Sequence, residues 1–78
     1  MINQIIVPTT YGQRLRASRH RAMLTTRELS RLTGVTQATI VRLENDQQPA
    51  RISTTRALAA ALNITPQALA GMEENSAT

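Results

Sequence analysis

The stretch Thr25–Asn45, TTRELSRLTGVTQATIVRLEN, contains the signals for two short helices with a glycine between them. It begins with a Thr-x-x-Glu capping box directly ahead of an apolar position, which predicts a helix over residues 26–32. Gly34 is expected to end that helix, because glycine readily adopts the positive φ that closes a helix. Thr36 then serves as the N-cap of a second helix, predicted over residues 37–44.

Two such helices joined by a short turn form the helix-turn-helix layout. The positions expected to face inward are apolar: Leu29, Val35, Ile40 and Leu43. The positions left on the outer side of the second helix are Gln37, Ala38, Thr39, Val41 and Arg42. A capped helix with short side chains at its start fits the major groove of DNA, which is about 12 Å wide. The layout therefore predicts a helix that reads duplex DNA.

The flanking sequence predicts three more helices. One spans residues 11–22, after two threonines that are candidate N-caps, and another spans residues 53–62. The last opens with the cap-and-proline pair Thr65-Pro66 and ends near Gly71. Only one aromatic residue is present, and alanine and leucine dominate the apolar residues, which also favours helices. These features predict an all-α fold, a compact domain of five helices.

The predicted helices divide the chain into three parts. Residues 1–10 form an N-terminal arm rich in β-branched residues, and Pro8 ends any regular element there. This arm is expected to be a short strand, a dimer element or a segment that lies across DNA. Residues 11–72 form the helix-turn-helix domain, and residues 73–78 form a small polar tail that we expect to be disordered.

The charge of the chain favours a polyanionic partner. All nine cations are arginines, and the net charge is +4. Two of the five acids lie in the tail, so residues 1–72 carry nine arginines against three acids. Arginine binds phosphate and guanine through two parallel hydrogen bonds, which lysine cannot do.

The composition argues against an enzyme and against a metal or cofactor site. The chain contains no cysteine, a single histidine (His20, expected on the surface) and three scattered glycines. It therefore lacks the residues of a nucleophilic site, a zinc site or a phosphate-cradling loop. No apolar run approaches the roughly 20 residues of a membrane span, so we expect a cytoplasmic protein with no cofactor and no membrane contact.

Several spaced pieces of the sequence match one family in order. They are Leu15 and Arg19, Leu24-Thr25, Glu28-Leu29-Ser30, Gly34-Val35-Thr36, Ile40, Leu43-Glu44-Asn45, Pro49, Leu58–Ile64 and Leu69. With these pieces the chain resembles the Cro and lambdoid-repressor family, the Xre-like helix-turn-helix regulators. The resemblance implies a lambda-repressor-like domain of five helices whose third helix reads DNA.

The same resemblance implies the residues that contact DNA. The base readers correspond to Gln37, Ala38 and Arg42. Glutamine pairs with adenine, arginine pairs with guanine, and the alanine methyl offers only an apolar contact, for instance to thymine. The other candidate DNA contacts, most of them to phosphates, are Thr26, Arg27, Thr36, Thr39, Asn45, Gln47 and Arg51.

The resemblance also implies a structural salt bridge between Arg19 and Glu44. Four positions depart from the family pattern, since Ser18, Thr33 and Thr55 replace apolar residues and Asp46 replaces a common glycine. We therefore expect a weaker core than is typical for the family.

Other arginines and the end of the last helix are harder to assign. We interpret Arg14, Arg16 and Arg21 as a solvated face, with at most one of the three in contact with a phosphate. Leu69 and Met72 are interpreted as the edge of the core or, preferably, as part of a dimer seam.

The function predicted from the sequence is sequence-specific binding of double-stranded DNA by a transcriptional regulator. A repressor acting as a homodimer on a two-fold operator fits best, because a lone domain contacts only a half-site. Control is expected to come either from the concentration of the protein itself or from a regulatory partner protein. Two alternatives stay open: the antitoxin and autoregulator of a toxin–antitoxin pair, or a protein-interaction module with the same fold.

Overall fold

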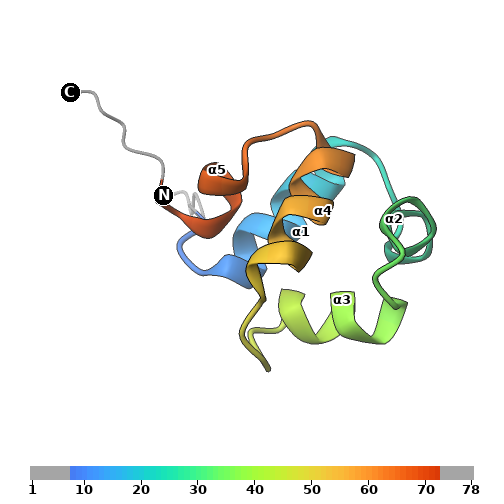
Figure 1. Cartoon of the computed structure of the whole chain (residues 1–78), viewed down its shortest axis with the longest axis horizontal. Helices are drawn as coiled ribbons and strands as arrows, with labels where there is room; N and C mark the ends of the chain where they lie inside the picture. The colour runs from blue at the N-terminus through green and yellow to red at the C-terminus, as the bar shows by residue number, and fades with distance from the viewer. Residues whose placement is uncertain (1–7, 73–78) are drawn as a thin grey trace, which may run out of the picture.

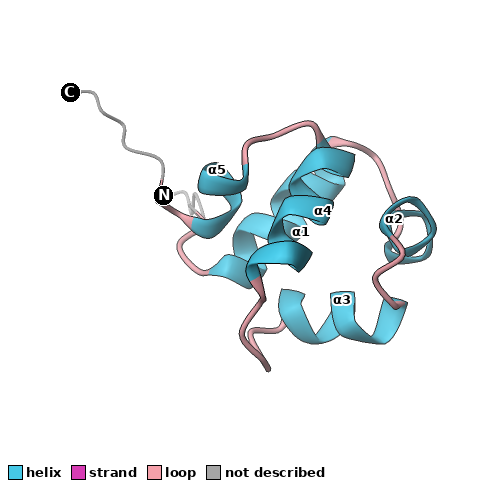
Figure 2. Ribbon diagram, in the orientation of Figure 1, coloured by secondary structure: helices cyan, strands magenta, loops and turns pink. Residues whose placement is uncertain are grey.

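The computed structural model describes residues 8–72 and contains five helices and no strand within that range (Figures 1 and 2). The helices are α1 (Tyr11–Arg21), α2 (Thr26–Thr33), α3 (Gln37–Glu44), α4 (Ile52–Leu62) and α5 (Pro66–Ala70). The predicted all-α class is therefore confirmed, and no predicted helix end is wrong by more than one residue. The first seven residues of the predicted arm and the predicted tail lie outside the described residues. No helix in the described range is long and apolar enough to cross a membrane.

Local side-chain signals set the helix ends. The Thr25 hydroxyl accepts a hydrogen bond from the backbone N–H of Glu28 at 3.0 Å, and the Glu28 carboxylate accepts one from the backbone N–H of Thr25 at 2.8 Å. Hydrogen bonding of the Glu28 carboxylate to Thr25, mainly to its backbone N–H, holds the pKa of Glu28 below its usual value. Gly34 ends α2 with φ 79°, a left-handed conformation that most residues avoid.

The core is built almost entirely from leucines, to which every helix contributes. Its fully or nearly fully buried members are Leu15, Leu29, Ile40, Leu43, Leu58, Ala59, Leu62 and Leu69. The contacts run in a closed ring: α1 packs on α3, α3 on α2, α2 on α4, α4 on α5, and α5 on α1. Helix α3 lies along the lower edge of the molecule in Figure 1, with its outer side away from this ring.

Three expectations about core positions can be compared with the structure. The preferred placement of Leu69 at a dimer seam is wrong, because its side chain is completely buried within this chain. Met72 is 73% exposed, so its side chain lies outside the core of this chain. Ser18 and Thr55 are buried despite their hydroxyls, since Ser18 Oγ accepts from Arg21 Nη2 at 3.2 Å and Thr55 Oγ1 lies 2.9 Å from the Tyr11 hydroxyl. Their polar atoms are thus satisfied where the family has apolar side chains.

The start of α1 lies directly against the end of α3. A Cβ atom on Gly12 would lie 2.6 Å from the carbonyl oxygen of Leu43, so only glycine permits this approach. Asp46, in the loop after α3, adds a link between the same two ends. Its carboxylate accepts from the Gly12 backbone N–H at 2.8 Å and from the Thr10 hydroxyl at 2.7 Å. These bonds lower the pKa of Asp46.

A buried carboxylate fixes the end of α3. Glu44 is 6% exposed, and its carboxylate accepts from Arg19 Nε at 2.6 Å and from Arg19 Nη2 at 2.9 Å. The structure thus brings together the two residues that the family resemblance pairs. Arg19 also donates to the backbone carbonyl of Leu24 at 3.0 Å, which connects the pair to the turn before α2. The bonds to Glu44 raise the pKa of Arg19.

The substitution Gly12→Ala is expected to destabilise the domain by about 3 kcal/mol, because the added methyl group meets backbone atoms of α3 that cannot rotate away. Gly34→Ala is the control: open space surrounds that Cβ position, so only the backbone cost of about 1–2 kcal/mol applies. Urea unfolding measures both. Equal stability of Gly12→Ala and the wild type would contradict the close approach.

The substitution Glu44→Ala is expected to cost about 3–5 kcal/mol, because it leaves the nearly buried Arg19 guanidinium without its counter-charge. Arg16→Met removes the longer, half-exposed pair with Glu44 and an exposed bond to Asn45, and it is expected to cost under about 1 kcal/mol. Urea unfolding at neutral pH measures the two losses. Similar losses of unfolding free energy for both variants would show that the bond between Arg19 and Glu44 stabilises the domain no more than the pair between Arg16 and Glu44.

Candidate nucleic-acid interface

Helix α3 exposes the residues that the sequence analysis selects as base readers. Gln37, Ala38 and Arg42 are exposed, and Thr39 is half-buried. On the opposite side of the helix Ile40 and Leu43 are buried in the core. The Thr36 hydroxyl caps the helix by accepting from the Thr39 backbone N–H at 3.2 Å. The outer side is therefore open, while the inner side is anchored.

The start of α2 contributes a second group of donors beside α3. Gln37 Nε2 donates to the Thr26 hydroxyl oxygen at 2.9 Å. This leaves the Thr26 hydroxyl hydrogen free to donate to an anion, and it leaves Gln37 with its amide oxygen and one N–H. One donor and one acceptor is the combination that an adenine edge requires. Arg27, the next residue of α2, is exposed.

The loop after α3 supplies a third group. Asn45, Gln47 and Arg51 are all exposed. Arg51 is the N-cap residue of α4 and makes no side-chain capping bond, since a guanidinium has no acceptor. Within residues 8–72, neither Arg42 nor Arg51 takes part in an ion pair.

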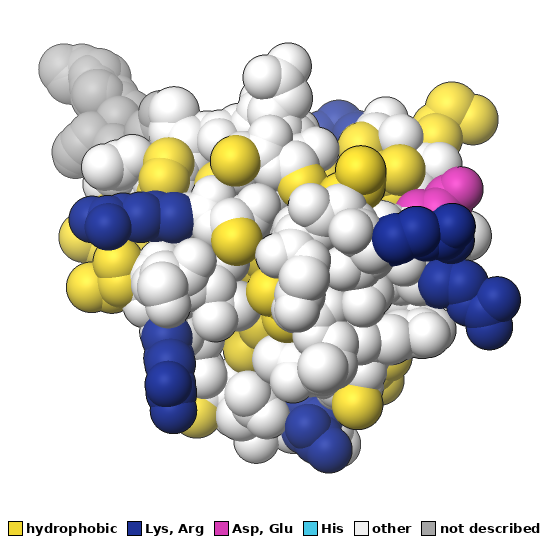
Figure 3. Space-filling view, turned by 45° about the vertical axis from the view of Figure 1, so that its right-hand side comes forward, with side chains coloured by type: hydrophobic (Ala, Val, Ile, Leu, Met, Phe, Trp, Pro, Cys, Tyr) yellow, Lys and Arg dark blue, Asp and Glu magenta, His cyan; other side chains and the backbone are white. Residues whose placement is uncertain are grey.

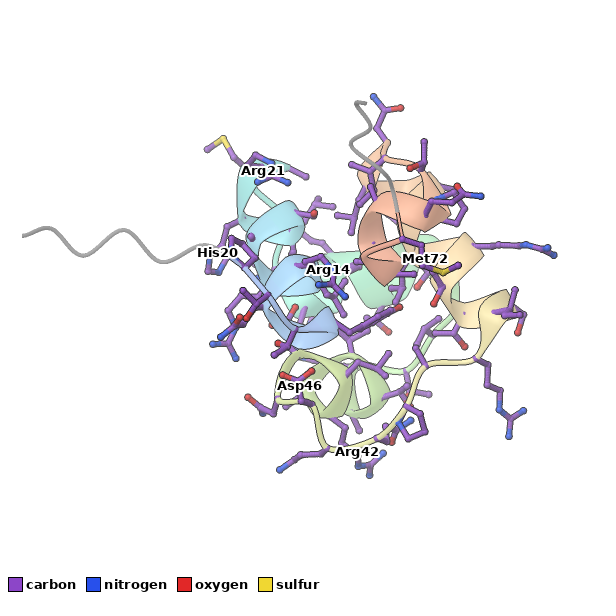
Figure 4. The ribbon with its side chains drawn as sticks, turned by 90° about the vertical axis from the view of Figure 1, so that its left-hand side faces the viewer. Arg14, His20, Arg21, Arg42, Asp46 and Met72 are labelled. Atoms are coloured by element: carbon purple, nitrogen blue, oxygen red, sulfur yellow. The ribbon has the colours of Figure 1, made fainter. Side chains whose placement is uncertain are left out.

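Basic side chains surround the face that α2 and α4 help to form. Figure 3 shows them standing out at the left, right and bottom edges, whereas acidic side chains are visible only at the right edge. In the view of Figure 4, Arg42 lies at the lower edge of the molecule and points away from the bundle. The edge of the molecule where Arg42 lies therefore carries exposed positive charge, which suits a polyanion.

The three arginines interpreted as a solvated face also make hydrogen bonds within the domain, and two of these bonds join distant elements. Arg14 lies between α1 and α5 (Figure 4), where its Nε donates to the Leu69 carbonyl at 2.8 Å and its Nη1 donates to the Thr9 carbonyl at 2.9 Å. Arg16 Nη2 donates to Asn45 Oδ1 at 3.1 Å. The sequence carries no local signal for these contacts, because the partners of Arg14 and Arg16 lie up to 55 positions away along the chain.

Comparison with known proteins agrees with this geometry. A family model described as a helix-turn-helix domain matches residues 10–71. The restriction-modification controller protein C.AhdI from Aeromonas hydrophila has a similar structure, with 32% identity and a TM-score of 0.73 over 76% of this chain and 89% of that one.

The P22 c2 repressor is similar in two solved structures, each 25% identical with a TM-score of 0.77. Its crystal structure in complex with a synthetic operator matches over 83% of this chain and 98% of that one. The solution structure of its DNA-binding domain matches over 94% and 95% respectively. No protein with a curated description matches the sequence. The chain belongs to the helix-turn-helix family and has the Cro and lambdoid-repressor type of fold.

Proposed function

We propose that this protein binds specific sequences of double-stranded DNA through α3 and regulates transcription. The observation that carries this proposal is the exposure of Gln37, Ala38 and Arg42 along one side of a capped helix whose other side is buried. The similarity to a controller protein and to a repressor crystallised on its operator supports it.

In the proposed complex the start of α3 enters the major groove. Gln37 contacts an adenine with its free amide oxygen and N–H, and Arg42 donates two hydrogen bonds to a guanine one turn further along. Ala38 brings its methyl group against a base edge. Thr26, Arg27 and Arg51, which border α3, contact phosphates and hold the helix in register.

We further propose that the protein acts as a homodimer and represses by covering promoter DNA. An apolar groove lies next to the loop that follows α3, between the start of α4 and α5. Ile52 and Met72 both line this groove and are 72% and 73% exposed, so it holds two large apolar side chains open to a partner. Two-fold binding requires the two α3 helices to lie in successive major grooves about 34 Å apart, and we propose that the copies meet through this groove.

The substitution Arg42→Ala is expected to weaken binding to a sequence selected from random DNA by about 1–3 kcal/mol and to relax specificity at one base pair. Arg51→Ala is the matched comparison, because it removes a phosphate contact and weakens all sequences alike. Electrophoretic shifts over a salt titration measure both. If the wild-type protein binds no DNA, the protein-interaction alternative replaces this proposal, and a small toxin that co-purifies with it would identify an antitoxin.

The substitution Ile52→Asp is expected to disrupt the dimer and leave the fold intact, because an acid in the first turn of α4 is favourable for the helix. The control is Met23→Asp, which removes an even more exposed apolar side chain outside the groove. Sedimentation equilibrium of the wild type and both variants measures the association. Unchanged dimerisation of Ile52→Asp would exclude this groove as the interface.

A further inference from the structure

Arg16 reaches from α1 to the end of α3, where two arginines share one acid. Its Nε lies 3.4 Å from Glu44 Oε1, while Arg19 makes the shorter contacts with the same carboxylate. Two guanidinium groups and one carboxylate leave one positive charge in excess. The Arg19 side chain is only 11% exposed, but the Arg16 side chain is 50% exposed, so the excess charge is accessible at Arg16.

The contact between Arg16 and Asn45 also determines which way the Asn45 amide faces. A guanidinium group has only donors, so the atom of Asn45 that lies 3.1 Å from Arg16 Nη2 is its oxygen. The amide NH₂ group then points away from Arg16. Asn45 is exposed, so these two N–H donors face solvent beside the accessible guanidinium.

Arg16 offsets the electrostatics expected at the end of a helix, where the nearby Asp46 carboxylate is already held by Gly12 and Thr10. The carbonyl groups at the C-terminal end of α3 carry partial negative charge, which repels an anion. Asn45 alone offers donors at that end but no positive charge. Arg16 supplies the charge and orients the donors, and it comes from a different helix.

We propose that Arg16 and Asn45 together bind one DNA backbone phosphate at the C-terminal end of α3. The inference rests on the proposed function, since the phosphate belongs to the duplex that α3 reads. Arg16 contacts the phosphate directly and also holds Asn45 in the donating orientation. With Thr26 at the other end of α3, this site fixes the helix on the DNA backbone from both ends.

The test replaces single phosphates of the bound DNA with neutral methylphosphonates. With wild-type protein, one replacement near the end of α3 is expected to weaken binding about tenfold or more, as for a lost hydrogen bond to a charged group. Arg16→Met is expected to weaken binding to unmodified DNA by a similar factor, and to lose any further sensitivity to that replacement. The slope of log affinity against log salt should fall by about 0.9, as for one phosphate fewer.

Two variants complete the experiment. Arg21→Met removes the same charge from α1 at the end remote from Arg42 (Figure 4), and it should leave the salt slope and the methylphosphonate pattern unchanged. Asn45→Asp keeps the side-chain shape but replaces the donors with a negative charge, so it should weaken binding more than Arg16→Met does. Thermal unfolding of each variant shows whether the fold is retained.

Each outcome decides the proposal. If wild-type protein binds DNA and Arg16→Met keeps the wild-type salt slope and the same methylphosphonate sensitivity, Arg16 makes no phosphate contact and the inference is wrong, while the proposed function stands. If Asn45→Asp binds as well as the wild type, the amide does not donate to a phosphate. If the wild-type protein binds no duplex DNA, the proposed function itself fails.

Discussion

The position of α3 depends on the buried carboxylate of Glu44. A helix of eight residues is too short to be stable alone in water, so its orientation must come from contacts with the rest of the domain. The bidentate bond from Arg19 secures its end, and the close approach of Gly12 brings the backbone of α1 against the same end. Everything exposed on the outer side of α3 is placed by these two contacts and by the Thr36 cap at its start.

An ion pair of this kind contributes more to orientation than to total stability. Removing two charges from water is costly, and an apolar replacement of both partners is often equally stable. A core made almost only of leucines, however, packs in many similar ways and does not itself fix the rotation of a short helix. The directional bonds between Arg19 and Glu44 select one rotation. The bonds between Arg19 and Glu44 complement the burial of Ile40 and Leu43, which holds the helix against the core but does not select one rotation about its axis.

The sequence predicts the helices well because their signals are local. The capping box at Thr25, the positive φ at Gly34 and the Thr65-Pro66 start each act within a few residues, and the structure has all three. The one helix start predicted a residue late is that of α4, where Arg51 makes no side-chain capping bond and so leaves no recognisable signal. The outward residues of α3 also follow from the helical period alone.

Contacts between distant parts of the chain were not predictable in the same way. The bond from Asp46 to the start of α1 joins residues 34 positions apart, and the bond from Arg14 to the end of α5 spans 55. An exposed arginine and a buried or bonded one look alike in sequence, so the sequence does not reveal the bonds of Arg14 and Arg16. The position of Leu69 is hidden for a related reason, since its burial depends on how α5 packs against α1 and α4.

The distribution of arginines separates two tasks in the proposed complex. Helix α3 contains a single arginine, Arg42, and otherwise presents short or neutral side chains to the groove. The other exposed arginines lie outside α3, on α1, on α2, and at the start and in the middle of α4. Phosphate contacts provide affinity that does not depend on sequence, whereas base contacts distinguish one sequence from another. Because the two sets lie on different elements, substitutions on the outer side of α3 can change which sequence is bound while the surrounding arginines keep the affinity of the domain for the DNA backbone.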